Sequence, residues 1–219
     1  MIKERKALCI LLAVLLVIIA ATIMLAIRMD KSPAMQSALQ ENAAGHIFKA
    51  SEVLHHAAEM LSSNDLAQAE NLLVSAIKQH PANTELWLLL GTVYYRQEKY
   101  ANAEAAFRHA VRRKHDSAAG YNNLCETLIK LERFSEAKSA IANALRLAPN
   151  RGEILLNAAS LYALLQEDKQ SLHFLKLALD NGIKPEEISK IKELVRLLER
   201  PDFMNFYKQK IRQTKEQKL

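Results

Sequence analysis

The chain has 219 residues, half of them hydrophobic and a quarter charged, which is typical of one folded domain with an appendage. Its five glycines and five prolines are too few for a turn-rich β protein, and the isolated glycines exclude a phosphate-binding loop or a dinucleotide fingerprint. The formal charge is +6, but the basic residues are dispersed except at the two ends, so we do not predict a nucleic-acid-binding protein.

The N-terminal segment is strongly apolar. Three basic residues lie within residues 1–6, and Ala7–Ile27 then contains no charged residue. At about 1.5 Å per residue, this helix would span roughly 31 Å, the thickness of a bilayer's hydrocarbon core. We therefore predict a transmembrane signal anchor over residues 7–27. A cleaved signal peptide is the alternative, but its apolar core is usually about 7–15 residues and ends at a small-x-small site that residues 27–30 do not offer.

The charges that flank this segment predict its orientation. Lys3, Arg5 and Lys6 precede it, whereas only Arg28 and Lys31 follow it closely. The positive-inside rule then places residues 1–6 in the cytoplasm and the body of the protein on the far side, the periplasm of a bacterium. An anchor in the mitochondrial outer membrane, with its body in the cytosol, would reverse this arrangement.

A polar linker over residues 28–49 leads to a sequence that, starting near Ala50, repeats itself with a period of about 34 residues. The clearest copy contains Trp87, Leu90, Gly91, Tyr94, Ala103, Phe107 and Ala110. The next contains Tyr121, Leu124, Cys125, Leu128, Ala137, Ile141, Ala144 and Pro149. The preceding copy contains Val53, His56, Ala57, Met60, Ala69, Leu73, Ala76 and Pro81. A degenerate fourth copy contains Leu155, Ala158, Ala159, Tyr162, Ser171, Leu175 and Ala178.

This pattern resembles the tetratricopeptide repeat, in which W-x2-L-G-x2-Y is followed by A-x3-F and a closing proline. The resemblance implies an α-solenoid of about four helix-turn-helix repeats. With the N-terminal transmembrane helix predicted above and C-terminal capping helices, the expected fold is all-α. The expected repeats are 50–83, 84–117, 118–151 and the degenerate 152–185. A capping helix over residues 186–200 and an amphipathic basic tail over residues 201–219 follow.

Small residues recur where two helices of a repeat must cross closely. Gly91, Cys125, Ala57 and Ala159 share one aligned position, and Ala69, Ala103 and Ala137 share another. We expect these positions to be buried, with Cys125 an inert core residue. Two cysteines in such contexts, Cys9 being in the apolar run, exclude a disulfide framework.

The C-terminal region shows helical spacing of Ile188, Ile191, Leu194, Val195 and Leu198, and we expect these residues to cover the last repeat. The tail contains Phe203, Phe206, Tyr207 and Ile211. Its last twelve residues contain five lysines or arginines, which either contact acidic lipid headgroups or remain solvated.

Catalytic and metal-binding motifs are missing from the sequence. His55 and His56 are adjacent, so they point about 100° apart on a helix and cannot chelate one metal together, and His56 aligns with core positions. We therefore expect no enzymatic activity, no cofactor and no metal.

In the tetratricopeptide-repeat family the first helices line a concave groove that binds proteins. The resemblance assigns to that groove Leu88, Leu89, Thr92, Tyr95, Arg96, Asn122, Asn123, Glu126, Ile129, Lys130, Asn157 and Ser160. The asparagines can hydrogen-bond a peptide backbone, and Tyr95 offers a flat face with a polar tip. A hydrated groove with no dedicated ligand is the alternative.

One family subtype uses a clamp of lysine, arginine and asparagine to hold a C-terminal carboxylate. Apart from Asn123, the aligned positions here are Leu54, Ala58, Leu89, Glu153 and Leu156, so the clamp lacks its cations.

We expect a membrane-tethered scaffold or adaptor that binds protein or peptide segments and no nucleic acid. Its expected role is to aid assembly of a bacterial envelope complex for secretion, cytochrome maturation or pilus formation. The alternative is an import or fission receptor on a eukaryotic organelle membrane. The sequence does not indicate the partner or the oligomeric state.

Overall fold

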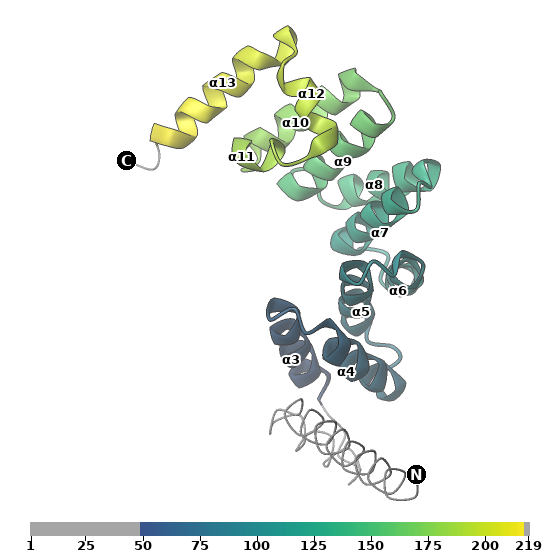
Figure 1. Cartoon of the computed structure of the whole chain (residues 1–219). Helices are drawn as coiled ribbons and strands as arrows, with labels where there is room; N and C mark the ends of the chain where they lie inside the picture. The colour runs from purple at the N-terminus through teal and green to yellow at the C-terminus, as the bar shows by residue number, and fades with distance from the viewer. Residues whose placement is uncertain (1–48, 217–219) are drawn as a thin grey trace, which may run out of the picture. The chain divides into compact units, whose positions relative to one another are not determined.

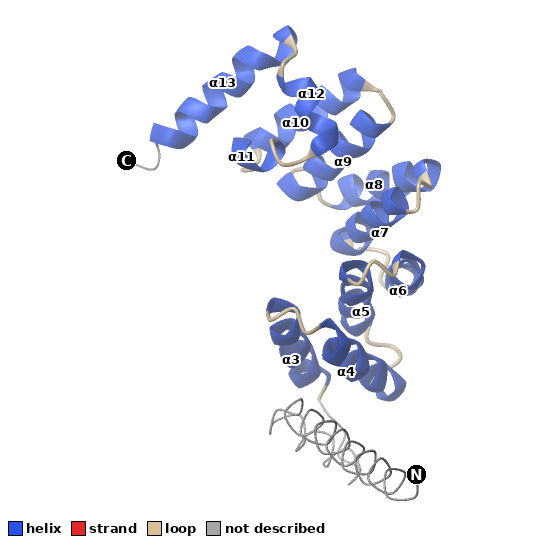
Figure 2. Ribbon diagram, in the orientation of Figure 1, coloured by secondary structure: helices blue, strands red, loops and turns tan. Residues whose placement is uncertain are grey.

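The computed structural model describes residues 49–216, and within that range every regular element is a helix (Figures 1 and 2). The helices are α3 (Ala50–Ser62), α4 (Leu66–Gln79), α5 (Thr84–Arg96), α6 (Tyr100–Arg113), α7 (Ala118–Lys130), α8 (Phe134–Leu147), α9 (Gly152–Leu164), α10 (Asp168–Asp180), α11 (Pro185–Ile188), α12 (Lys192–Leu198) and α13 (Pro201–Glu216). The predicted transmembrane segment, residues 7–27, lies outside the described residues. Between residues 49 and 216, no helix is both long enough and apolar enough to cross a bilayer.

Helices α3 to α10 form four pairs that follow one another in chain order (Figure 1). The first helices begin at residues 50, 84, 118 and 152, and the second helices begin at residues 66, 100, 134 and 168, so both series advance by the same constant step. Each first helix packs against its own second helix, and that second helix packs against the first helix of the next pair. The chain is therefore an all-α solenoid in this region, as predicted.

The turn inside each pair uses a left-handed residue at the same position of the repeat. Asn64, Glu98, Glu132 and Gln166 have φ of 62°, 60°, 58° and 60°. Side chains cap some of the helices that follow a turn or loop. Asn83 Oδ1, for example, accepts hydrogen bonds from the backbone nitrogens of Glu85 and Leu86 at the start of α5. Local chemistry thus fixes where the helices begin and end.

The close crossing of α5 and α6 requires the glycine that the sequence pattern singled out. A Cβ atom added to Gly91 would lie 2.6–2.8 Å from three ring carbons of Phe107, which is 1% exposed. At the equivalent position of the other pairs, Ala57, Cys125 and Ala159 are fully buried. The prediction that small residues permit these crossings is confirmed.

The degenerate fourth repeat keeps the same packing with a polar substitute. Ser171 stands where the other second helices have alanine, and it is fully buried. Its hydroxyl donates a 2.7 Å hydrogen bond to the backbone oxygen of Ala159 on α9. A buried hydroxyl with a partner costs little, so the repeat tolerates the substitution.

The C-terminal cap differs from the single helix expected over residues 186–200. The structure has two short helices, α11 and α12, separated at residues 189–191. This break lets Ile188, Leu194 and Leu197 all reach the core, where each is fully buried, whereas Val195 is 43% exposed. An unbroken helix could not turn all three toward one surface, because their spacing of six and three residues spreads them around its axis. Phe203 at the start of α13 is also fully buried in this cluster.

Candidate functional site

A small pocket opens between the second and third helix pairs. It has a volume of about 80 Å³ and is lined by Thr92 and Tyr95 of α5, Phe107 of α6, and Asn123 and Glu126 of α7. Four of these five residues are among those predicted for the groove from the first helices. The structure therefore brings Thr92, Tyr95, Asn123 and Glu126 together at one place.

Glu126 is held in this pocket by two asparagine side chains. Asn157 Nδ2, from α9, donates to Glu126 Oε1 and also to Asn122 Oδ1, the latter at 2.9 Å. Asn122 Nδ2 lies 3.4 Å from the same Glu126 oxygen. No hydrogen bond to Glu126 Oε2 occurs among the described residues. Among the described residues, one carboxyl oxygen therefore accepts from both asparagines and the other accepts from none.

Burial raises the pKa of Glu126 above its ordinary value, and the negative charge of Glu153 acts in the same direction. The hydrogen bonds from Asn157 and Asn122, and the charge of Lys130, oppose this effect only partly. Burial, and then the charge of Glu126, raise the pKa of Tyr95 to about 12. The tyrosine hydroxyl therefore keeps its proton at neutral pH and can donate a hydrogen bond.

Other predicted groove residues serve the fold. Arg96 Nη1 donates a 2.8 Å hydrogen bond to the backbone oxygen of Leu61 at the end of α3. Asn122 and Ser160, both assigned to the groove from the sequence, are 8% and 7% exposed, so little of either side chain reaches the surface. Leu88 and Ile129 pack against the core, Leu89 is half-buried, and Lys130 is exposed. The repeat pattern grouped these residues on the first helices but could not separate those that line the pocket from those that support it.

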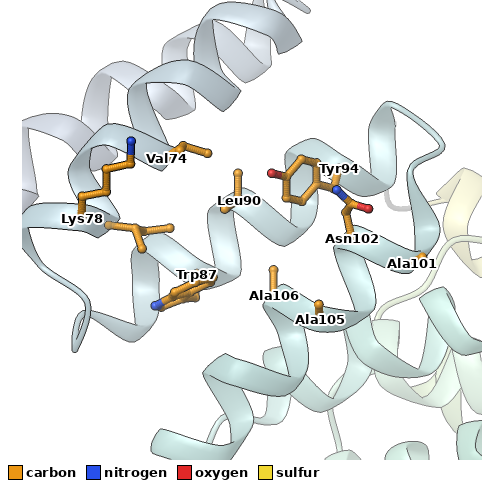
Figure 3. A pocket seen from close by; sticks show the side chains of 10 residues that line it. Val74, Lys78, Trp87, Leu90, Tyr94, Ala101, Asn102, Ala105 and Ala106 are labelled. Atoms are coloured by element: carbon orange, nitrogen blue, oxygen red, sulfur yellow. The ribbon is translucent and has the colours of Figure 1, made fainter.

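A larger groove that the sequence analysis did not predict lies between α4 and α6, with α5 at its base (Figure 3). This α4–α6 groove has a volume of about 520 Å³. It is lined by Val74, Ile77, Lys78, Trp87, Leu90, Tyr94, Ala101, Asn102, Ala105 and Ala106. Trp87 stacks on His109 with ring centroids 4.0 Å apart, and its indole nitrogen donates to the backbone oxygen of Pro81. The three alanines on α6 could have indicated this groove in the sequence, because small side chains leave the space between the helices unfilled.

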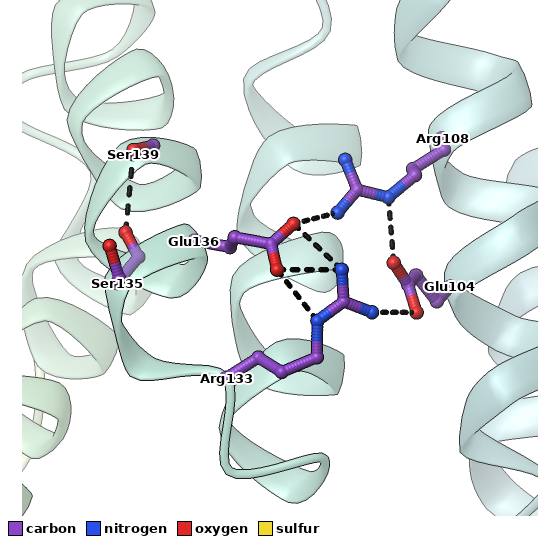
Figure 4. Close-up of polar contacts among 6 residues, drawn as sticks. All are labelled: Glu104, Arg108, Arg133, Ser135, Glu136 and Ser139. Carbon is purple, nitrogen blue, oxygen red and sulfur yellow. Dashed lines mark hydrogen bonds and ion pairs between the residues drawn. The ribbon is translucent and has the colours of Figure 1, made fainter.

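The equivalent surface between α6 and α8 is occupied by charged side chains (Figure 4). Arg133 donates to Glu104 at 2.6 Å and to both oxygens of Glu136 at 2.7 Å, and Arg108 bridges the same two glutamates. We call these four residues the α6–α8 seam. Hydrogen bonds from Arg133, and then from Arg108, lower the pKa of Glu136, so this carboxyl group is ionised at neutral pH.

The histidines and the cysteine predicted to be non-catalytic have ordinary surroundings. His55 and His56 are both exposed and lie 3.3 and 3.2 Å from Glu59, so His56 is not the core residue that its alignment suggested. Burial raises the pKa of the Cys125 thiol to about 12, which leaves it protonated and poorly nucleophilic. Within residues 49–216, no group of three histidine, cysteine or acidic side chains is arranged to hold a metal ion.

Helix pairs stacked with a fixed period define the class of protein: an α-solenoid built from tandem repeats. Two family models, both described as tetratricopeptide repeat, match residues 60–128 and 118–151. Tetratricopeptide repeats are thus confirmed in this chain.

Solved structures share this fold. A thermophilic tetratricopeptide-repeat protein of Thermus thermophilus, TTC0263, is 23% identical, with 74% of this chain and 89% of that chain covered and a TM-score of 0.63. MamA is 19% identical, with 74% and 95% of the two chains covered and a TM-score of 0.61. At this level of identity the likeness shows the fold alone. No curated protein matches the chain in sequence.

Proposed function

We propose that the chain is a membrane-tethered scaffold that binds a protein partner on the surface formed by its first helices, and that it catalyses no reaction. The observation that carries this proposal is the convergence of Thr92, Tyr95, Asn123 and Glu126, from two helix pairs, on one pocket. An aromatic ring, two side-chain hydroxyls, an amide and a carboxyl group offer both donors and acceptors to a peptide segment.

The proposed tether is the apolar segment Ala7–Ile27, with the repeats on the periplasmic side of a bacterial inner membrane. A tether confines the repeats to the membrane surface and raises their effective concentration for partners held there. This situation suits a protein that helps to assemble an envelope complex of the secretion, cytochrome-maturation or pilus type. The assignment to such complexes is an analogy at the level of the fold.

Site-specific crosslinking in native membranes tests the binding surface. A photoreactive residue at position 92 or 123 should capture a discrete partner, whereas the same residue at position 112, exposed on α6, should not. Capture from position 112 with none from positions 92 and 123 would move the binding site to another face.

A protease-protection experiment tests the tether and its orientation. In spheroplasts, added protease should digest the repeats while residues 1–6 stay protected, and alkaline washing should leave the undigested chain in the membrane. Release of the chain by alkali would contradict the anchor, and protected repeats would reverse the orientation.

A further inference from the structure

We propose that the pocket between α5, α6 and α7 receives a cationic side chain, lysine or arginine, of the protein partner, with Glu126 as its counter-charge. This inference rests on the proposed function of the first-helix surface as a partner-binding site. It adds the chemistry of the side chain that the pocket selects.

Only one oxygen of the Glu126 carboxyl group accepts hydrogen bonds from the described residues. Its Oε1 atom accepts from Asn157 and Asn122, which aim the group and leave Oε2 without a hydrogen bond among the described residues. A half-buried carboxylate with no bound cation is costly, and this cost is the physical reason that burial favours its neutral form. A cation in the pocket would remove the cost, because it would supply the missing charge next to the free oxygen.

No cation of residues 49–216 forms an ion pair with Glu126. Lys130 lies one turn later on α7 and acts on Glu126 through its charge, but within residues 49–216 no ion pair joins the two side chains. Arg96 is hydrogen-bonded to the backbone oxygen of Leu61, and Arg151 pairs with Glu153 at 2.8 Å. The carboxyl group therefore remains available to a cation from outside.

Two aromatic rings also line the pocket. The rings of Tyr95 and Phe107 border the pocket, and aromatic rings attract ammonium and guanidinium groups through their electron-rich faces. The pocket is small, with a volume of about 80 Å³, so we assign to it only the head of one long side chain.

The charged and titratable groups that face Glu126 come from three helices. Tyr95 lies on α5, Lys130 on α7 and Glu153 on α9. Tyr95 keeps its proton, Glu153 is already paired with Arg151, and Lys130 adds a competing positive charge, so Glu126 itself must supply the counter-charge for an entering cation.

The test uses the full chain in detergent with ¹³C-labelled glutamate carboxyl groups, and n-butylammonium chloride and n-butanol as probes at matched ionic strength. Butylammonium should lower the pH midpoint at which the Glu126 carboxyl signal titrates and should shift the amide signals of Thr92 and Asn123. Butanol has nearly the same shape without the charge and should do neither. Equal responses to the two probes, or none to butylammonium, would overturn the proposal.

Two variants complete the test. Glu126→Gln keeps the shape and an oxygen for Asn157, and should weaken butylammonium binding roughly tenfold or more. Glu153→Gln removes a neighbouring exposed charge and should change binding by roughly twofold at most. If Glu126→Gln failed to fold, the proposal would be tested by the unmodified chain alone. The pH midpoint of its Glu126 carboxyl signal would be compared with and without butylammonium.

Crosslinking from position 92 separates failure of this inference from failure of the proposed function. Loss of partner capture in both Tyr95→Ala and Glu126→Gln supports the cation site. Loss of capture in Tyr95→Ala with full capture in Glu126→Gln would support the binding surface but contradict the cation site. Full capture in both variants would contradict the proposed surface itself.

Discussion

The α4–α6 groove and the α6–α8 seam occupy equivalent places in successive repeats. Both contain an ion pair between a second helix and the turn that precedes the next one: Glu70 with Lys99 at 2.9 Å, and Glu104 with Arg133 at 2.6 Å. Of the two regions, only the seam has further ion pairs, because Arg108 and Glu136 stand where the groove has Val74 and Asn102.

This difference shows how a repeat protein can vary its surface without altering its framework. The helices keep the same lengths and period through both regions. Two of the side-chain positions that differ place charges between neighbouring second helices in the seam, where the groove has Val74 and Asn102.

The largest effect is expected from Gly91→Leu, which disrupts the α5–α6 crossing that both regions share. The new side chain must displace the fully buried ring of Phe107, so the free energy of unfolding should fall by about 1–3 kcal/mol or more. Thermal and urea unfolding measure the loss. Ala142→Leu at an exposed site on α8 is the control, and equal stability of the two variants would refute this packing.

The next effect is expected in the seam. Glu104→Gln removes the charge that two arginines share, and should lower the free energy of unfolding by on the order of 1 kcal/mol. Glu70→Gln removes one partner of a single pair and should cost roughly a few tenths of a kcal/mol. Urea unfolding at low and high salt measures both losses. Equal costs would mean that the additional pair adds nothing to the seam.

The seam and the pocket should also differ in the sign of their pH dependence. Arginine contacts lower the pKa of Glu136, so its contribution is present above the ordinary value of 4.5 and is lost as pH falls through the lowered pKa. Burial raises the pKa of Glu126, so its penalty appears as pH rises above 4.5 through the raised pKa. At neutral pH, Glu136→Gln should therefore destabilise the chain and Glu126→Gln should stabilise it. Unfolding curves between pH 3 and pH 7 measure how each substitution changes the free energy of unfolding. Changes of the same sign for both variants at neutral pH would contradict this interpretation.

A smaller effect is expected at the turns, which the two regions have in common. Glu98 and Glu132 adopt left-handed conformations with φ of 60° and 58°, where glycine is not strained. Replacing either by glycine should raise the free energy of unfolding by roughly 0.5–1 kcal/mol. Equal gains in the free energy of unfolding would show that the two regions differ in their side chains and not in the turns of their helix pairs. Losses would mean that the two glutamates are not strained.

The smallest effect on stability is expected from rebuilding the seam inside the groove. The double substitution Val74→Arg with Asn102→Glu should add an ion pair worth roughly a few tenths of a kcal/mol. It should also cover Trp87, the chain's single tryptophan, which lines the groove (Figure 3). Acrylamide quenching of tryptophan fluorescence measures that cover. Unchanged quenching would show that the new pair does not close the groove.

The sequence was sufficient for the repeat and for its most constrained positions. Gly91, Cys125 and Ala159 could be assigned to helix crossings because only small residues fit there and the period repeats them. The faces of the first helices followed from the same phase, so Thr92, Tyr95, Asn123 and Glu126 were identified together. The sequence was less informative where the repeat ends: the break between α11 and α12 depends on how Ile188 and Leu194 reach the core of the fourth pair.

An all-helical repeat with a constant period could be predicted from the sequence alone, because short-range spacing and small-residue positions are properties of the chain. The structure was needed to show that Asn122 and Asn157 hydrogen-bond Glu126, and that charged side chains occupy the space between α6 and α8 whereas the groove beside Trp87 is open. These outcomes depend on side chains that are distant in the chain and meet across neighbouring helices. Contacts of that kind are fixed by how the repeats stack, which the spacing along one helix does not encode.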